Sequence, residues 1–189
     1  QMKIGRRLAI KVLNASKFAL GSGDAPADAA VTEAIDQAML GELAALVDDT
    51  TAAFEAFDYA RALQRTEDFF WRFCDDYLEL VKTRAYRPDD AAALSARVAL
   101  RTAVSTLLRL FAPFVPYVTE EVWSWCQGDN GAMADFQDGS IHRAMWPSAD
   151  ELRVRMGESP TAGGVPSPLL VATDVLRQIR KAKSDAKVS

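Results

Sequence analysis

The side chains best suited to bind a ligand lie near the start of the chain. At about 100° per residue of a helix, Arg7, Lys11, Asn14 and Phe18 fall in one row, and Lys17 lies beside it. Cations bind phosphate, an amide hydrogen-bonds to a base edge, and an aromatic ring offers a surface on which an unstacked base can lie. Their combination on one helix predicts a binding site for single-stranded RNA.

A plainer interpretation of the same stretch stays open at this level. An apolar stripe runs beside the row and is predicted to face the core. Its members are Ile4, Leu8, Val12, Ala15 and Ala19. Lys and Arg next to such a stripe often do no more than solvate a helix, and Phe18 would then be one more core residue. Periodicity alone does not choose between the two interpretations.

The order of residue types favours RNA binding. Residues 11–18 read Lys-Val-Leu-Asn-Ala-Ser-Lys-Phe, which resembles the Lys-x-x-Asn-Ala-x-(Arg/Lys)-Phe motif that opens the anticodon-binding domain of valyl-tRNA synthetases. The isoleucyl and leucyl enzymes carry related motifs and are the nearest alternative. Lys17 stands where many members have Arg, which weakens bidentate contact to a phosphate or base. Asp76 and Met145 also differ from the usual Trp and Pro.

Three later segments resemble the same family, in the same order. Residues 70–79 read Phe-Trp-Arg-Phe-Cys-Asp-Asp-Tyr-Leu-Glu, and residues 113–123 read Pro-Phe-Val-Pro-Tyr-Val-Thr-Glu-Glu-Val-Trp. Residues 142–147 resemble the segment that closes the domain, and residues 177–189 resemble the start of the family's C-terminal extension. The similarity covers most of residues 2–147.

The resemblance implies a role for each residue of the first helix. Lys11 and Lys17 would contact anticodon phosphate or base, Asn14 would hydrogen-bond to a base edge, and Phe18 would stack on a base. Arg7, with Lys3, would position the RNA backbone. The family reads the second and third anticodon bases, so the partner implied is the anticodon stem-loop of valine tRNA.

The family joins valine to its tRNA with ATP, but this chain is not expected to do so alone. The family's ATP-handling motifs are missing, as are GxGxxG and phosphate-binding loops. Since the chain opens with Gln and with a helix already in full pattern, it is predicted to be a piece of a longer enzyme. ATP and Mg²⁺ are implied only for that parent, and no cofactor is expected here. The protein is expected to be cytoplasmic and monomeric, with neither membrane nor DNA as a partner.

The composition is that of an ordinary soluble domain with an uneven distribution of charge. The 189 residues are 49% hydrophobic and 25% charged, with a net charge of −4. Residues 1–20 hold five cations and no acid, whereas residues 24–58 hold many acids and neither Lys nor Arg. Such a distribution steers a polyanion onto the first helix and away from its neighbours.

Hydrophobic periodicity predicts an all-α fold, a bundle of about five helices with a short extended segment and a C-terminal helix. The predicted helices cover residues 1–20, 27–56, 59–85, about 91–112 and a short stretch capped by Thr119. The predicted domains are an anticodon-binding bundle (1–147), a linker (148–168) and a basic helix at the start of the extension (169–189). A polar, glycine-rich loop is predicted over 127–139, and an extended segment over 140–147.

Other reactive side chains are given structural roles. Cys74 and Cys126 lack metal-ligand spacing and are predicted to be buried, and the lone His142 is predicted to be a surface or packing residue. Glu120 and Glu121 are predicted to belong to the start of a helix, with a glycosidase-like carboxylate pair as the alternative. The competing function is a helical protein–protein module, whose binding would depend little on salt, unlike RNA binding.

Overall fold

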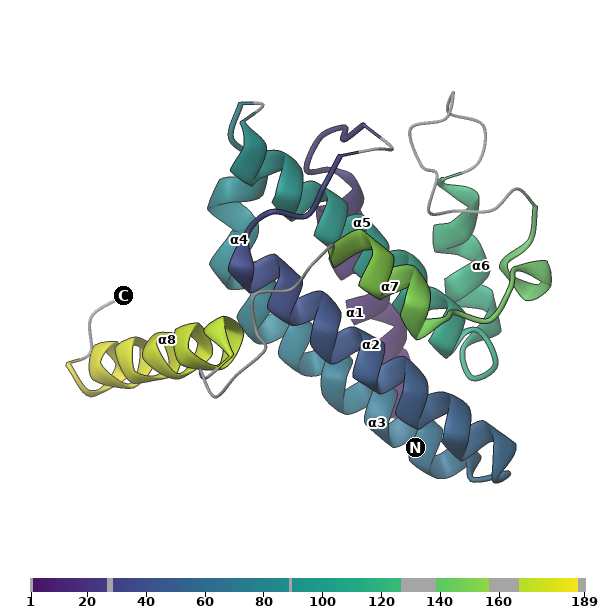
Figure 1. Cartoon of the computed structure of the whole chain (residues 1–189). Helices are drawn as coiled ribbons and strands as arrows, with labels where there is room; N and C mark the ends of the chain where they lie inside the picture. The colour runs from purple at the N-terminus through teal and green to yellow at the C-terminus, as the bar shows by residue number, and fades with distance from the viewer. Residues whose placement is uncertain (1, 27–28, 89, 127–138, 157–166, 187–189) are drawn as a thin grey trace.

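The computed structural model describes residues 2–26, 29–88, 90–126, 139–156 and 167–186. These residues form a helical bundle in which no strand occurs (Figure 1). The elements in chain order are α1 (Met2–Leu20), α2 (Ala34–Glu55), α3 (Tyr59–Arg72), a π-helical turn η1 (Phe73–Tyr77), α4 (Leu78–Ala85), α5 (Ala91–Phe111), α6 (Pro116–Ser124), a 3₁₀ turn η2 (Ile141–Arg143), α7 (Ala149–Met156) and α8 (Pro168–Asp185). The predicted all-α class is confirmed.

Helix α5 forms the centre of the bundle. Its N-terminus is capped by Asp90, whose side chain accepts from the Ala93 N–H at 2.6 Å. Every residue from Ser95 to Phe111 is buried, since helices α1, α2, α3, α4 and α6 pack around it. The helix is long and apolar enough to cross a membrane, but 83% of the stretch concerned is buried inside the protein. This is the pattern of a core helix.

Helix α1 buries the predicted apolar stripe. Leu8, Val12, Ala15 and Ala19 are all buried in the core, where α1 packs against α5 and α6. The side chain of Ile4 lies outside the described part of the chain. Because the stripe occupies one side of the helix, the predicted binding row is left at its margin and on its exposed side.

Helix α2 begins later than predicted. The prediction placed its start at residue 27, but the helix starts at Ala34. The segment before it is fixed by tertiary contacts: the backbone N–H groups of Thr32 and Glu33 both donate to the Ser95 hydroxyl at 3.1 Å. Val31 is buried there. Anchoring to α5 therefore overrides the helical propensity of this Ala-rich stretch.

Helices α2 and α3 form an antiparallel pair, which Figure 1 shows side by side. Asp58 caps α3, since its side chain accepts from the Arg61 N–H at 3.1 Å. The predicted single helix over 59–85 is correct in path but is interrupted by the π-helical turn η1. A π turn inserts an extra residue into a helix and changes the directions of the side chains that follow.

Two predictions about residues 113–147 are wrong. Thr119 does not cap the short helix, because α6 already begins at Pro116 and the Thr119 hydroxyl donates back to the Val115 and Pro116 carbonyls. The expected extended segment over 140–147 contains the 3₁₀ turn η2, capped by the Ser140 side chain. The predicted loop at 127–139 lies almost entirely outside the described residues.

The predicted linker over 148–168 is wrong for its first half. Residues Ala149–Met156 form α7, which packs on α2 with Leu152 only 1% exposed. The bundle thus continues past residue 147, and residues 157–166 lie outside the described part. The predicted C-terminal helix is confirmed as α8, which extends away from the bundle toward the C-terminus (Figure 1).

Candidate nucleic-acid interface

A groove of about 270 Å³ lies between α1 and the helical path formed by η1 and α4. Its lining residues are Lys11, Asn14, Ala15, Phe18, Cys74, Leu78, Glu79 and Lys82. The apolar members give it a surface on which an aromatic ring can lie, and amide, carboxylate and ammonium groups also line it. A groove of this size and lining suits a single unstacked base.

Phe18 is held in the groove by a second ring. Its ring centroid lies 5.4 Å from that of Tyr86 at an interplanar angle of 58°, and the Tyr86 hydroxyl donates to the Phe18 carbonyl at 3.4 Å. Phe18 is half-buried, so it is both a packing residue and a groove residue. Asn14, one turn earlier, is exposed and keeps its amide available to a ligand.

Lys11 is held by weak contacts at one end of the groove. Its ammonium lies 3.0 Å from the Asp75 carboxylate, and the two side chains are 34% and 59% exposed. It also lies 5.7 Å from the centre of the Trp71 ring, over which the Arg7 guanidinium lies at 5.0 Å. Exposed ion pairs and cation–π contacts are individually weak. A phosphate can therefore replace Asp75 as the partner of Lys11.

The five predicted contact residues do not all lie together. Lys11, Asn14 and Phe18 meet in the groove, and Arg7 lies beyond its end at Trp71. Lys17 is on the other flank of α1, where its ammonium lies 5.7 Å from the centre of the ring of Trp125, the residue that caps the C-terminus of α6. The side chain of Lys3 lies outside the described residues.

The π-helical turn η1 directs consecutive side chains to different neighbours. Cys74 lines the groove, and Asp75 accepts from Lys11 of α1. Asp76 accepts from Arg180 of α8 at 3.4 Å, and the Tyr77 hydroxyl donates to Asp36 of α2 at 2.8 Å. The turn therefore fixes the groove wall to three separate helices.

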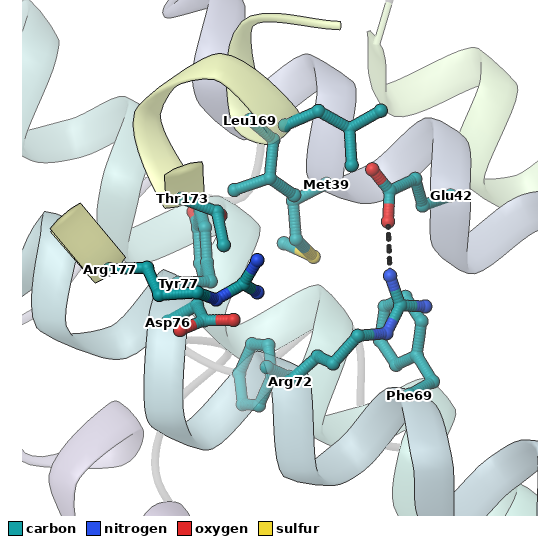
Figure 2. Close-up of a pocket in the computed structure, with 11 residues that line it drawn as sticks. Met39, Glu42, Phe69, Arg72, Asp76, Tyr77, Leu169, Thr173 and Arg177 are labelled. Carbon is teal, nitrogen blue, oxygen red and sulfur yellow. Dashed lines mark hydrogen bonds and ion pairs between the residues drawn. The ribbon is translucent and has the colours of Figure 1, made fainter. Parts of the chain in front are cut away.

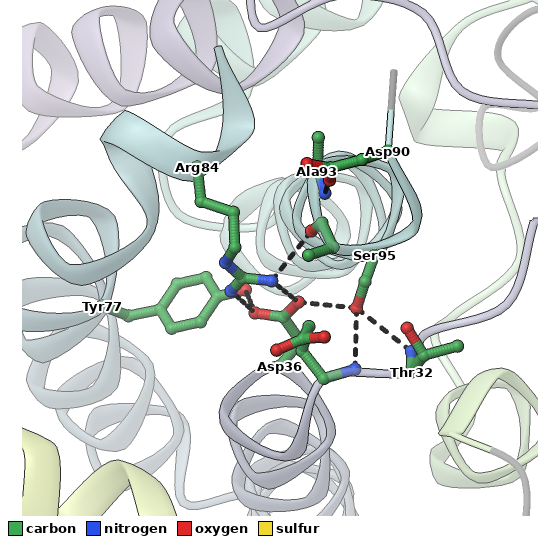
Figure 3. A network of polar contacts seen from close by, with 9 residues as sticks. Thr32, Asp36, Tyr77, Arg84, Asp90, Ala93 and Ser95 are labelled. Carbon is green, nitrogen blue, oxygen red and sulfur yellow. Dashed lines mark hydrogen bonds and ion pairs between the residues drawn. The ribbon is translucent and has the colours of Figure 1, made fainter. Parts of the chain in front are cut away.

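A buried polar network anchors this wall to the core (Figure 3). Asp36 is fully buried and accepts from Tyr77, from Arg84 at 2.6 and 2.8 Å, and from Ser95 at 2.7 Å. Burial and the adjacent carboxylate raise the pKa of the Tyr77 hydroxyl well above its ordinary value, so Tyr77 remains a donor. Burial alone would lower the pKa of Arg84, but hydrogen bonds to Asp36 raise it. The network joins α2, α4 and α5.

Helix α8 packs against the other side of η1. Figure 2 shows Leu169 of α8 near Met39, Thr173 beside Tyr77, and Arg177 beside Asp76. Arg180 also donates to the Asp75 carbonyl at 2.8 Å. The basic helix is thus anchored on the turn that carries Asp75, the partner of Lys11.

The remaining reactive side chains have structural surroundings. Cys74 and Cys126 are buried as predicted, and burial raises the pKa of each thiol to about 12, which makes them poor nucleophiles. Glu120 accepts from the Ser140 hydroxyl and the Ile141 N–H and so holds η2. His142 is exposed and lies 3.9 Å from Glu120. Within the described residues, no group of three or more His, Cys, Asp or Glu is placed to hold a metal ion.

Glu120 and Glu121 do not start their helix, because α6 begins at Pro116. That part of the prediction is wrong. Glu121 instead accepts from the Trp125 indole N–H at 3.1 Å. Each carboxylate therefore serves a structural contact, and the two do not face each other across a cleft as a glycosidase pair does.

Several groove residues could not be found from the sequence pattern. Glu79 and Lys82 belong to α4, where the periodicity predicts only which residues are apolar, and Tyr86, which contacts Phe18, directly follows that helix. Trp71 and Trp125 have the composition of core residues, although they lie under cations of α1. The one sequence feature that could have indicated these residues is the alternation of aromatic and basic residues along these helices.

Comparison of the sequence with known proteins places the chain in a family. The sequence model described as the anticodon-binding domain of tRNA ligase matches residues 36–189. The chain belongs to this family of anticodon-binding domains. It is also similar over its whole length to valine–tRNA ligases: 56% identical to that of Thermobifida fusca, 52% to that of Salinispora tropica and 49% to that of Cutibacterium acnes.

The relatives extend the comparison to α1. The family match starts within α2 at residue 36, whereas the valine–tRNA ligases cover 100% of this chain, including the groove helix. The chain spans 20% to 22% of the length of these relatives. The predicted resemblance to valyl-tRNA synthetases is confirmed.

Proposed function

We propose that this chain is the anticodon-binding part of a valine–tRNA ligase and that it holds the anticodon stem-loop of valine tRNA in the groove between α1 and α4. The observation that carries the proposal is the meeting of Lys11, Asn14 and Phe18 around a space that suits one base. Two of these groups, an amide and an aromatic ring, are those that recognise unstacked bases, and the third binds phosphate.

Each groove residue has a distinct task in this proposal. Phe18 stacks on the base, and the Asn14 amide, which is both donor and acceptor, pairs with its edge. Lys11 exchanges the Asp75 carboxylate for a phosphate, as Lys82 does with Glu79, with which it pairs at 2.7 Å. Arg7 follows the RNA backbone at the groove's end. These exchanges use weak, exposed pairs, so they cost little free energy.

The chemistry of aminoacylation would take place outside this chain. ATP and Mg²⁺ would be used by the rest of the enzyme, since the sequence carries no phosphate-binding loop. This part would contribute recognition of the tRNA. We expect it to be monomeric and cytoplasmic, with neither DNA nor membrane as a partner.

The test is the affinity of the chain for anticodon stem-loops of valine tRNA, with the second anticodon base kept or changed, at two salt concentrations. Asn14→Ala should weaken binding to the unchanged loop by about 5–150-fold, because a good base contact is worth about 1–3 kcal/mol. Binding should also weaken as salt rises. The matched control is Gln64→Ala, which removes an exposed amide from α3 and should bind like the parent chain.

Equal affinity for the two loops, together with no effect of Asn14→Ala, would refute base recognition in the groove. Binding unaffected by salt would favour a protein–protein module instead. One observation supports that second candidate: Val171, Val175 and Ile179 lie along α8 at four-residue spacing and are each about half exposed. A protein partner bound there would be independent of Asn14.

A further inference from the structure

We propose that Trp125, which directly follows α6, is a second base-stacking site, on the flank of α1 opposite the groove. This inference rests on the proposed function, because it requires single-stranded RNA to cross α1. The partner is the nucleotide next to the one in the groove. Its base would lie on the indole ring, and its phosphate would remain over α1.

The two flanks are joined by neighbouring residues of α1. Lys17 and Phe18 are consecutive, yet Phe18 lines the groove while the Lys17 ammonium lies 5.7 Å from the centre of the Trp125 ring. The exposed Asn14 lies between the two flanks, one turn earlier. Since a helix with its side chains is about 10–12 Å wide, a short single-stranded segment can reach from the groove across α1 to Trp125.

The Trp125 ring is already oriented for stacking. Its N–H donates to the Glu121 carboxylate at 3.1 Å on the preceding turn of α6, and its ring is partly buried against the core. These contacts fix the plane of the indole. Lys17 is an exposed, flexible side chain, so a base can displace its ammonium from the ring without disturbing the fold. A base stacks on an aromatic ring more strongly than an exposed cation binds to one.

The charges on the two helices favour this arrangement of base and backbone. At the ring, α6 carries the carboxylate of Glu121, which repels phosphate. The facing residues of α1, including Lys17, are cationic or neutral. Phosphate is therefore drawn to α1, while the uncharged base can lie over α6. Lys17, once displaced from the ring, becomes available to that phosphate.

The experiment measures binding of the same valine anticodon stem-loop, intact and with each loop nucleotide in turn made abasic. Trp125→Ala should weaken binding to the intact loop by about 5–100-fold, the usual effect of removing one stacking ring. Trp125→Phe, which keeps a ring, should retain most of the affinity. One abasic position should weaken binding by the parent chain but have no further effect on Trp125→Ala, because base and ring form one contact.

The matched control is Tyr117→Ala, which removes a ring of α6 that is 91% exposed and should leave binding unchanged. If Trp125→Ala binds like the parent chain while Asn14→Ala loses affinity, the second site is refuted and the proposed function stands. If Trp125→Ala weakens the intact and all abasic loops equally, the ring does not stack on a base and the inference is also refuted. If neither Asn14→Ala nor Trp125→Ala changes binding, both the second site and the proposed function are refuted.

Discussion

The Asp36 network and the groove between α1 and α4 use the same kinds of side chain with opposite results. Asp36 is fully buried, and the Arg84 side chain paired with it is only 14% exposed. In the groove, the paired side chains of Lys11 and Asp75 are 34% and 59% exposed. The difference in burial decides which cluster maintains the fold and which remains available to a ligand.

The physical reason is the cost of removing charge from water. A buried carboxylate must be fully paired, so every contact of Asp36 is committed to Tyr77, Arg84 and Ser95. An exposed pair keeps most of its hydration and gains little from its partner. Lys11 can therefore change partners at small cost, whereas Arg84 cannot.

The largest expected effect is on the buried network. Asp36→Ala should lower the free energy of unfolding by about 3–5 kcal/mol, because it leaves Arg84 charged and without its buried partner. Urea denaturation measures this loss. Asn14→Ala serves as the comparison and should change stability by no more than about 0.5 kcal/mol. If Asp36→Ala lowered the free energy of unfolding by less than about 1 kcal/mol, the proposed difference between the two clusters would be wrong.

A smaller effect is expected in the groove. Asp75→Asn removes the carboxylate that competes with phosphate for Lys11, so binding of the valine anticodon stem-loop should tighten, by less than about tenfold, while stability changes by about 1 kcal/mol or less. Titration of the stem-loop at low salt measures the gain. Asp68→Asn, an exposed acid of α3, is the control for net charge alone. Weaker binding by Asp75→Asn than by this control would contradict the exchange.

The smallest effect on stability at neutral pH is expected from the two buried thiols. Burial raises the pKa of Cys74 and Cys126 from 9.0 to about 12 in the folded protein. Below about pH 9 both states keep neutral thiols and the contribution to stability is constant. Between about pH 9 and 12 only the unfolded state ionises, so stability falls as pH rises. Denaturation curves at several pH values measure this fall.

The control for this titration is the double variant Cys74→Ala with Cys126→Ala, which lacks both thiols. Its stability should fall less steeply with pH in the same window. An identical slope in the parent chain would mean that other groups, such as lysines, account for the loss.

The sequence predicted the parts of the fold that depend on local pattern. The apolar stripe of α1 follows from the 3.6-residue repeat, and its members from Leu8 to Ala19 are buried in the structure. Predictions failed where distant contacts decide. Residues 27–33 resemble a helix in composition, but Ser95 holds the backbone of Thr32 and Glu33. Helix α7 is short and mainly polar, and its two buried residues, Ala149 and Leu152, are too few to give a clear periodic signal.

The candidate site divides in the same way. Lys11, Asn14 and Phe18 were placed on one row by the helical repeat, and they do share the groove. The opposite wall could not be predicted, because Asp75 lies 64 residues beyond Lys11 and the π-helical turn sets the directions of its neighbours. The helical repeat also could not predict which neighbour Lys17 contacts, because only the packing of α6 brings Trp125 beneath it.

By itself, the sequence determined that the chain is helical, which side of α1 is buried, and that a row of cationic, amide and aromatic residues runs beside that side. These properties depend on residue type and on the 3.6-residue repeat, which act over a few neighbours. Only the tertiary structure decided which α1 residues share a groove, which residues face them, and which polar groups are committed to the core. Those outcomes depend on the packing of helices far apart in sequence and on the burial that packing imposes.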